Sequence, residues 1–147
     1  MENKSQKAQQ LFREGYNCAQ SVFCAYSDEL GIDFDTALKL SSSFGGGMGR
    51  LREVCGALSA MFMIAGLKQG YTTPNNDEIK GEHYARIQKL ASEFEKINGS
   101  IICRELLGLD VKHDVPIPEK RTQEYYQSRP CEAIIGSAAK IISEYIQ

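Results

Sequence analysis

The sequence has neither a long apolar run nor a block of like charges. Its longest apolar stretch, residues 57–67, is broken by Ser59 and Gly66 and is shorter than the roughly 20 residues that span a bilayer. The 17 basic and 19 acidic residues are scattered, so neither nucleic acid nor an anionic membrane is an expected partner. Residues 1–6 are polar and contain no apolar signal segment. We therefore expect a cytoplasmic protein without a membrane span.

Patterns typical of strands are also missing. No segment alternates between apolar and polar residues, and no β-branched run is bounded by turn residues. There is no internal repeat or linker, and 147 residues with 42% hydrophobic content suit one domain with one core. We predict an all-α fold over residues 1–147, a single-domain bundle of five to seven helices.

Apolar residues that recur every three to four positions mark the predicted helices. The predicted helix 51–67 is apolar around most of its circumference and should be central and buried. It could also help to form a homodimer, but a buried core explains it equally well. The predicted helices cover residues 5–14, 17–30, 35–40, 51–67, 76–97, 101–107 and 131–145, with one helical turn near 119–126 in the polar connection 109–128.

Four of the five cysteines fall in or near the first turn of a predicted helix. Backbone N–H groups and the positive end of the helix dipole stabilise a thiolate there, so a lowered cysteine pKa is expected. Thiolates attack disulfides and bind metals, and helices packed around one core could bring the sulfurs together. They could then form disulfides or ligate a metal or an iron–sulfur cluster. The candidate catalytic residues, which are also the candidate metal ligands, are Cys18, Cys55, Cys103 and Cys131.

Arginines stand near three of these cysteines in the chain, namely Arg52, Arg104 and Arg129, and could stabilise thiolates if their side chains turn the right way. The remaining cysteine, Cys24, follows Cys18 by six residues and points about 120° away around the helix. We predict that Cys24 is a core residue.

Inert cysteines are the main alternative, because free cysteine is often buried as a small apolar residue. The sequence contains no CxxC pair, and the spacings of 37, 48 and 28 residues match no zinc or ferredoxin pattern. His83 could serve as a ligand or proton donor near the thiols, but a hydrogen-bonded core histidine is the favoured interpretation. No Ser/His/Asp set or carboxylate pair stands out.

A glycine-rich loop at residues 45–49 precedes Cys55. Such a loop before a helix can cradle an anion. Arg50 takes the place of the third glycine of GxGxxG, and no strand precedes the loop, so nucleotide binding is not expected. The loop should let its backbone approach the cysteine site closely, a plain tight connection being the alternative. The candidate cofactor-binding positions are Gly45, Gly46, Gly47, Gly49 and Gly56.

An ordered set of motifs covers the chain from about residue 8 to its end. It consists of Asn17-Cys18-Ala19-Gln20, Phe44-Gly45-Gly46-Gly47-Met48-Gly49, Val54-Cys55-Gly56-Ala57, Gly99 to Gly108 around Cys103, and Arg129-Pro130-Cys131. With these motifs the chain resembles the C-GCAxxG-C-C family, small domains inferred to be redox-active. The resemblance implies a redox role for the four cysteines. One departure is Ala60, which stands where the motif has glycine.

Three hypotheses follow. The favoured one is a small redox protein that cycles its four cysteines between thiols and disulfides, or holds an iron–sulfur or other metal centre, and exchanges electrons with a partner protein. The second is a non-catalytic module that binds or carries a soft metal such as zinc or iron. The third is an interaction domain with inert buried cysteines.

Overall fold

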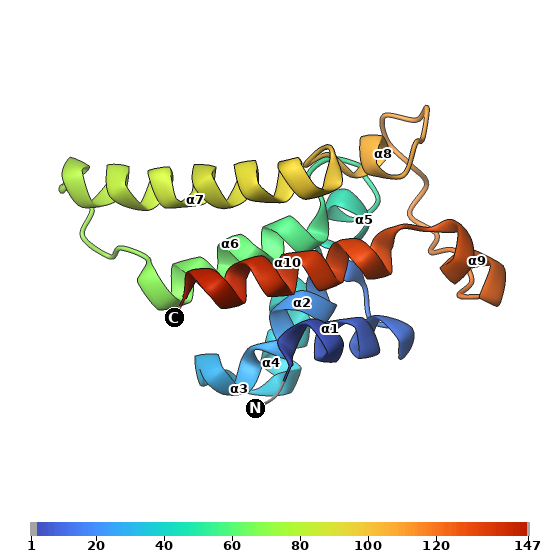
Figure 1. The fold of residues 1–147 in the computed structure, drawn as a ribbon, viewed down its shortest axis with the longest axis horizontal. Helices are drawn as coiled ribbons and strands as arrows, with labels where there is room; N and C mark the ends of the chain where they lie inside the picture. The colour runs from blue at the N-terminus through green and yellow to red at the C-terminus, as the bar shows by residue number, and fades with distance from the viewer. Residues whose placement is uncertain (1–2, 147) are drawn as a thin grey trace.

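The computed structural model describes residues 3–146, which form helices and connecting loops without a β-strand, as expected. The helices run α1 Lys4–Arg13, α2 Cys18–Ala25, α3 Ser27–Leu30, α4 Phe34–Ser42, α5 Gly45–Met48, α6 Gly56–Gln69, α7 Asp77–Asn98, α8 Cys103–Leu106, α9 Gln123–Ser128 and α10 Cys131–Tyr145 (Figure 1).

The prediction of five to seven helices was too low for the described residues. The expected helix 17–30 is divided at Tyr26 into α2 and α3, and the single helical turn expected near 119–126 is the short helix α9. The label α5 covers two left-handed glycines, Gly46 and Gly47, so this segment is a pair of turns rather than a regular helix. Nine regular helices therefore remain in residues 3–146.

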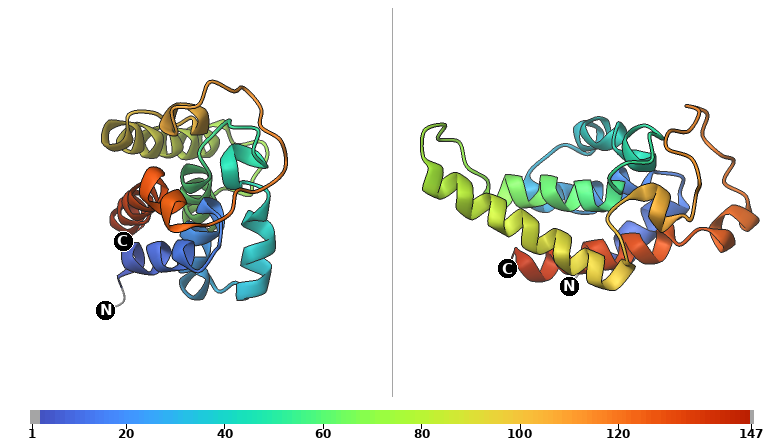
Figure 2. Two further views of the ribbon diagram at one scale, coloured as in Figure 1. Left: turned by 90° about the vertical axis from the view of Figure 1, so that its right-hand side faces the viewer. Right: turned by 90° about the horizontal axis from the view of Figure 1, so that it is seen from above.

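Helix α6 lies at the centre of the molecule, with α7 on one side and α1 and α2 on the other, while α10 packs along it (Figures 1 and 2). Its apolar surface is used within the chain, because Leu58, Met61 and Ile64 are buried in the core. Tyr26 joins α10 to this core through a hydrogen bond from its hydroxyl to the Ala139 carbonyl at 2.8 Å. No helix in the described part of the chain combines the length and apolar character needed to cross a membrane.

Local signals fix the point at which α2 begins. The Asn17 side chain accepts a hydrogen bond from the Gln20 N–H at 2.8 Å, and the Gln20 side chain accepts one from the Asn17 N–H at 3.1 Å. This reciprocal capping box satisfies two N–H groups that the first turn leaves free. It makes Cys18 the first residue of α2, within the first turn of the helix that the sequence predicts over 17–30.

The predicted helix 51–67 begins five residues later than expected, at Gly56. The preceding backbone pairs with the segment before α8, where Val54 and Ile102 form an isolated antiparallel bridge. The Cys55 N–H donates to the Ile101 carbonyl at 2.9 Å, and the Cys103 N–H donates to the Glu53 carbonyl at 2.6 Å. These bonds hold residues 53–55 extended, and Cys55 becomes the residue that precedes α6.

Candidate functional site

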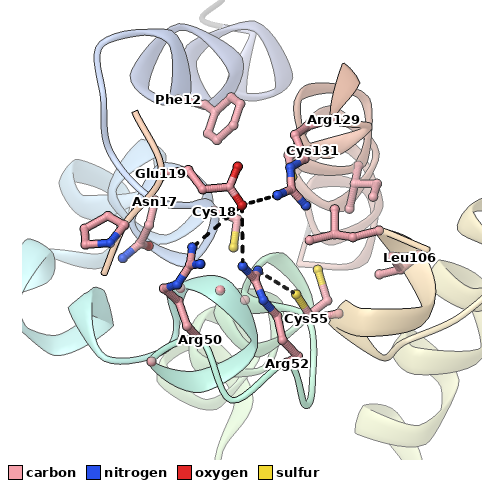
Figure 3. Close-up of a pocket in the computed structure, with 18 of the residues that line it drawn as sticks. Phe12, Asn17, Cys18, Arg50, Arg52, Cys55, Leu106, Glu119, Arg129 and Cys131 are labelled. Carbon is pink, nitrogen blue, oxygen red and sulfur yellow. Dashed lines mark hydrogen bonds and ion pairs between the residues drawn. The ribbon is translucent and has the colours of Figure 1, made fainter. Parts of the chain in front are cut away.

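One cavity of about 430 Å³ lies where the starts of α2, α6, α8 and α10 meet. Figure 3 shows side chains from these elements around it, with the sulfur of Cys18 pointing inward. The structure therefore brings together all four cysteines that the sequence selects. The cavity is lined by Cys18, Cys55, Cys103 and Cys131.

The four cysteines differ in depth. Cys18 and Cys131 are partly exposed at the first residues of α2 and α10, whereas Cys55 and Cys103 are each only 7% exposed. The last two flank the Val54–Ile102 bridge, one on each paired segment. Because side chains alternate between the two faces of paired extended segments, Cys55 and Cys103 lie on the same face, in diagonal positions.

The glycine-rich loop approaches the cysteines closely, as expected. A Cβ atom on Gly47 would lie 2.6 Å from the Cys103 Cβ, and one on Gly56 would lie 2.6 Å from the Cys18 Sγ. Glycine is therefore required for space at both positions. The cofactor-binding role of this loop stays a prediction; the positions that line the cavity are Gly45, Gly46, Gly49 and Gly56.

The backbone at the end of the glycine-rich loop and just after it is strained beside the cavity. Met48, Arg50 and Arg52 have φ values of 71°, 67° and 59°, a left-handed conformation that residues other than glycine seldom adopt. Backbone hydrogen bonds hold this segment, among them Glu53 N–H to the Gly47 carbonyl at 2.9 Å. Both arginines line the cavity, so the strained conformation sets where two guanidinium groups stand.

The expectation of lowered thiol pKa values was wrong for three of the four cysteines. Burial raises the pKa of Cys131 to about 12 and raises those of Cys103 and Cys55 as well. The negative charge of a Cys18 thiolate contributes to all three increases. The N–H groups at the start of α6 oppose the change at Cys55, but desolvation of the thiolate is the larger effect.

All five cysteines in the described residues are free thiols. Cysteine sulfur is a soft ligand that suits zinc and iron–sulfur clusters. Within residues 3–146, however, no three or more His, Cys, Asp or Glu side chains are grouped closely enough to hold a metal ion. The donor chemistry of the cavity suits a metal while the present spacing of the groups does not, so metal ligation stays a prediction.

Sequence reasoning found only part of the charged lining. Arg52 and Arg129 line the cavity, whereas Arg104 turns away to pair with Glu53 at 3.3 Å. The others could not be selected from the sequence, because their distance from the cysteines depends on how the segment after the glycine-rich loop and the connection 109–128 pack in the folded chain. The charged residues that were missed are Arg50, Arg121 and Glu119.

The remaining candidates lie where the sequence suggested. Cys24 is fully buried beside Ser41, outside the cavity, and burial raises its pKa. His83 does not line the cavity; its Nδ1 accepts a hydrogen bond from Arg86 at 3.0 Å, as a packed core histidine would. Ala60 is buried inside α6 and has no positive φ, so the residue in place of the motif glycine fits a regular helix.

The fold and the cavity define a class of small helical protein in which cysteines from four helix starts share one site. Residues 16–145 match the family described as "Putative redox-active protein (C_GCAxxG_C_C)", and the chain belongs to that family.

A relative from Archaeoglobus fulgidus, named "Uncharacterized protein", is 25% identical over an alignment 147 residues long. This alignment covers 95% of this chain and 91% of the relative. The similarity therefore extends over nearly the whole length of both proteins. No solved structure matches the chain.

Proposed function

We propose that the protein is a dithiol–disulfide redox protein whose reactive groups are the four cysteines of the cavity. The observation that carries this proposal is that Cys18, Cys55, Cys103 and Cys131, distant in sequence, line a single cavity. Four thiols are an unusual lining for a cavity that serves packing alone, and paired thiols are the minimum that reversible two-electron chemistry needs.

Accessibility suggests the order in which two of these thiols react. Cys18 is partly exposed at the first residue of α2, where it can meet a substrate. Its sulfur lies against Gly56, directly beside Cys55 in the chain. We assign Cys18 as the attacking thiol and Cys55 as the buried thiol that resolves the intermediate.

The reaction balances as thiol–disulfide exchange with a disulfide of a partner protein. The Cys18 thiolate attacks one sulfur of that disulfide, forms a mixed disulfide and releases the first partner thiolate. The Cys55 thiolate then attacks the Cys18 sulfur of the mixed disulfide and releases the second thiolate of the partner. This chain loses two electrons as a disulfide forms between Cys18 and Cys55. The two protons from its thiols pass to the partner, which becomes a dithiol. A reducing cytoplasmic setting would favour regeneration of the thiols.

Soft-metal binding is the second candidate, and the chemistry of the donor set favours it. A bound metal ion would lower the pKa values that burial raises and deprotonate the thiols. The cysteines would be its ligands, either in an electron-transferring iron–sulfur centre or in a carrier module for zinc or iron.

Single Cys→Ser variants at the four cavity positions test the proposal, with Cys24→Ala as the matched control outside the cavity. Each protein is purified without oxygen, assayed for iron, sulfide and zinc, and titrated in buffers of defined thiol–disulfide potential. We expect the wild type and Cys24→Ala to show the same two-electron transition, and Cys18→Ser and Cys55→Ser to lose it.

The other outcomes separate the alternatives. Iron with sulfide, or zinc, that is lost from each of the four serine variants and retained by Cys24→Ala would replace dithiol chemistry with metal ligation. Four serine variants with unchanged potential, metal content and stability would show that the cysteines are inert, and the proposal would fail.

A further inference from the structure

Three arginines converge on one carboxylate at the mouth of the cysteine cavity. Glu119 forms an ion pair with Arg129 and lies 4.0 Å from both Arg50 and Arg52. Figure 3 shows its carboxylate between the three guanidinium groups, on the side of Cys18. These groups come from the strained loop after α5 and from the residue before Pro130, so the fold assembles them from distant segments.

The charges around this carboxylate do not balance. Four arginines line the cavity, and among the described residues that line it Glu119 is the only one with a carboxylate. Asp114 provides a second partner from outside, at 3.1 Å from Arg50 and 3.0 Å from Arg52. Three guanidinium groups thus face two carboxylates, and positive charge remains in a partly desolvated place where an anion would be stabilised.

The arginines are better buried than the carboxylate that they hold. The side chain of Arg52 is 4% exposed and that of Arg129 is 14% exposed, whereas that of Glu119 is 40% exposed. Glu119 also belongs to the irregular connection between α8 and α9, which passes beside α5 (Figure 2). Glu119 is the more exposed partner in each pair, and water screens the attraction on its side. The carboxylate can therefore be displaced, while the arginine site is fixed.

The cavity has room for more than the carboxylate. Its volume of about 430 Å³ is in the range of small-molecule sites, and apolar groups of Phe12, Leu106, Ile134 and Pro118 form part of its wall. A ligand held at the arginines by its anionic group could place an organic body against these residues and beside the thiols.

The geometry points to a binding site for a small organic oxyanion, such as a carboxylate or sulfonate, formed by Arg50, Arg52 and Arg129 and occupied by Glu119 when no ligand is bound. Planar guanidinium groups recognise such anions with paired hydrogen bonds. This site deepens the proposed function by naming the class of molecule bound beside the thiols. Binding itself requires only the arginines, so it can be tested apart from the redox reaction.

Isothermal titration calorimetry with succinate, and separately with methanesulfonate, tests the site on the full chain. Glu119→Gln removes the internal competitor with almost no change in shape and should tighten binding of at least one probe about tenfold or more. Glu124→Gln is the matched control, because it removes an exposed carboxylate from α9 that does not line the cavity. Adding Arg129→Gln to Glu119→Gln should abolish the gain.

Hydrogen exchange of the wild type gives a second reading that does not depend on a variant. Binding of a probe should displace Glu119 and increase exchange of the backbone amides in residues 109–122. The inference is overturned if neither probe binds more tightly to Glu119→Gln than to Glu124→Gln. It is equally overturned if the gain survives Arg129→Gln or if saturating probe leaves exchange in residues 109–122 unchanged. A variant without the four cysteines that still binds the probe would uphold the site even if dithiol chemistry were disproved.

Discussion

The guanidinium group of Arg52 donates a hydrogen bond to the sulfur of Cys103 across 3.6 Å in the buried wall of the cavity. The same group donates to Asp114 through Nε at 3.2 Å and Nη2 at 3.0 Å. One side chain thus joins a buried thiol to a carboxylate of the connection 109–122. Burial raises the pKa of Cys103, and the hydrogen bond from Arg52 opposes that increase.

Replacement of Arg52 by Gln should raise the pKa of Cys103 further, because the thiolate loses its nearest cation and the desolvation cost remains. The measurement is the rate of Cys103 alkylation against pH, followed by peptide mass spectrometry. The rate profile should move to higher pH in Arg52→Gln. Arg50→Gln is the control, since Arg50 pairs with Asp114 but makes no hydrogen bond to the sulfur. Equal profiles in the two variants would contradict the assignment.

The Cys131 thiol should make the reduced protein less stable at alkaline pH. Burial raises its pKa from 9.0 to about 12. Between these values the unfolded chain releases a proton that the folded chain retains, so the free energy of unfolding falls as pH rises, by about 1.4 kcal/mol per pH unit. The contribution of the protonated Cys131 thiol to the free energy of unfolding is complete below pH 9 and is lost as pH approaches 12.

Urea unfolding of the wild type and of Cys131→Ser from pH 8 to pH 11 checks this prediction. The wild type should lose stability faster than the variant, which has no thiol at this position. Parallel curves for the two proteins would show that the Cys131 pKa is not raised by folding.

Gly47→Ala should destabilise the protein by about 3 kcal/mol or more. The new Cβ would lie 2.6 Å from the Cys103 Cβ and 2.7 Å from the Glu53 nitrogen, at a φ of +70°. Gly81→Ala is the control, because nothing lies within 4 Å of its Cβ and it sits inside α7. The free energy of unfolding of Gly81→Ala should rise by about 1 kcal/mol. Chemical unfolding of both proteins measures the difference, and similar stabilities would refute the close packing of the loop.

Gly56→Ala should disturb Cys18 specifically. Alanine favours a helix, but its Cβ would lie 2.6 Å from both the Cys18 sulfur and the Phe44 carbonyl oxygen. We expect a loss of about 2 kcal/mol and an altered rate of Cys18 alkylation. Gly66→Ala, in the same helix and with open space, should be neutral or stabilising and leave that rate unchanged. An unchanged Cys18 rate in Gly56→Ala would argue against the contact.

Arg121 should stabilise the connection to α1 in a way that lysine cannot reproduce. It donates to the Phe12 and Tyr16 carbonyls at 3.0 and 3.1 Å and stacks 4.4 Å from the centre of the Phe12 ring. Arg121→Lys should lower the free energy of unfolding by roughly 2 kcal/mol, since the planar guanidinium group and its stacking are removed. The exposed Lys120→Ala is the control and should change stability by less than about 0.5 kcal/mol. Thermal unfolding that fails to separate the two would contradict this role.

Much of the fold follows from local patterns. The long periodic segment 76–97 corresponds to α7, Asp77–Asn98, and the Asn17–Gln20 pair fixes the start of α2. The apolar period also continued through residues 51–55, where long-range pairing with Ile101 and Ile102 overrides it. A local pattern cannot reveal such a partner, because the competing hydrogen bonds come from a segment far along the chain.

The cysteines of the site could be predicted, but their surroundings could not. Their placement at helix starts is visible in the sequence, whereas the depth of Cys55 and Cys103 depends on how α6 and α8 pack. That depth determines the direction of the pKa change. Glu119 and Arg121 lie in the polar connection 109–128, whose tertiary contacts no local pattern predicts, so only the folded chain shows that they reach the cavity.

The Val54–Ile102 bridge makes two backbone amides into reporters of the site. The N–H groups of Cys55 and Cys103 each donate across this bridge, and each belongs to a cysteine of the cavity. Any rearrangement that moves the two paired segments apart must lengthen at least one of these bonds. The amide proton shifts of residues 55 and 103 in a nitrogen-15 spectrum could therefore follow oxidation, metal uptake or anion binding without a label on sulfur.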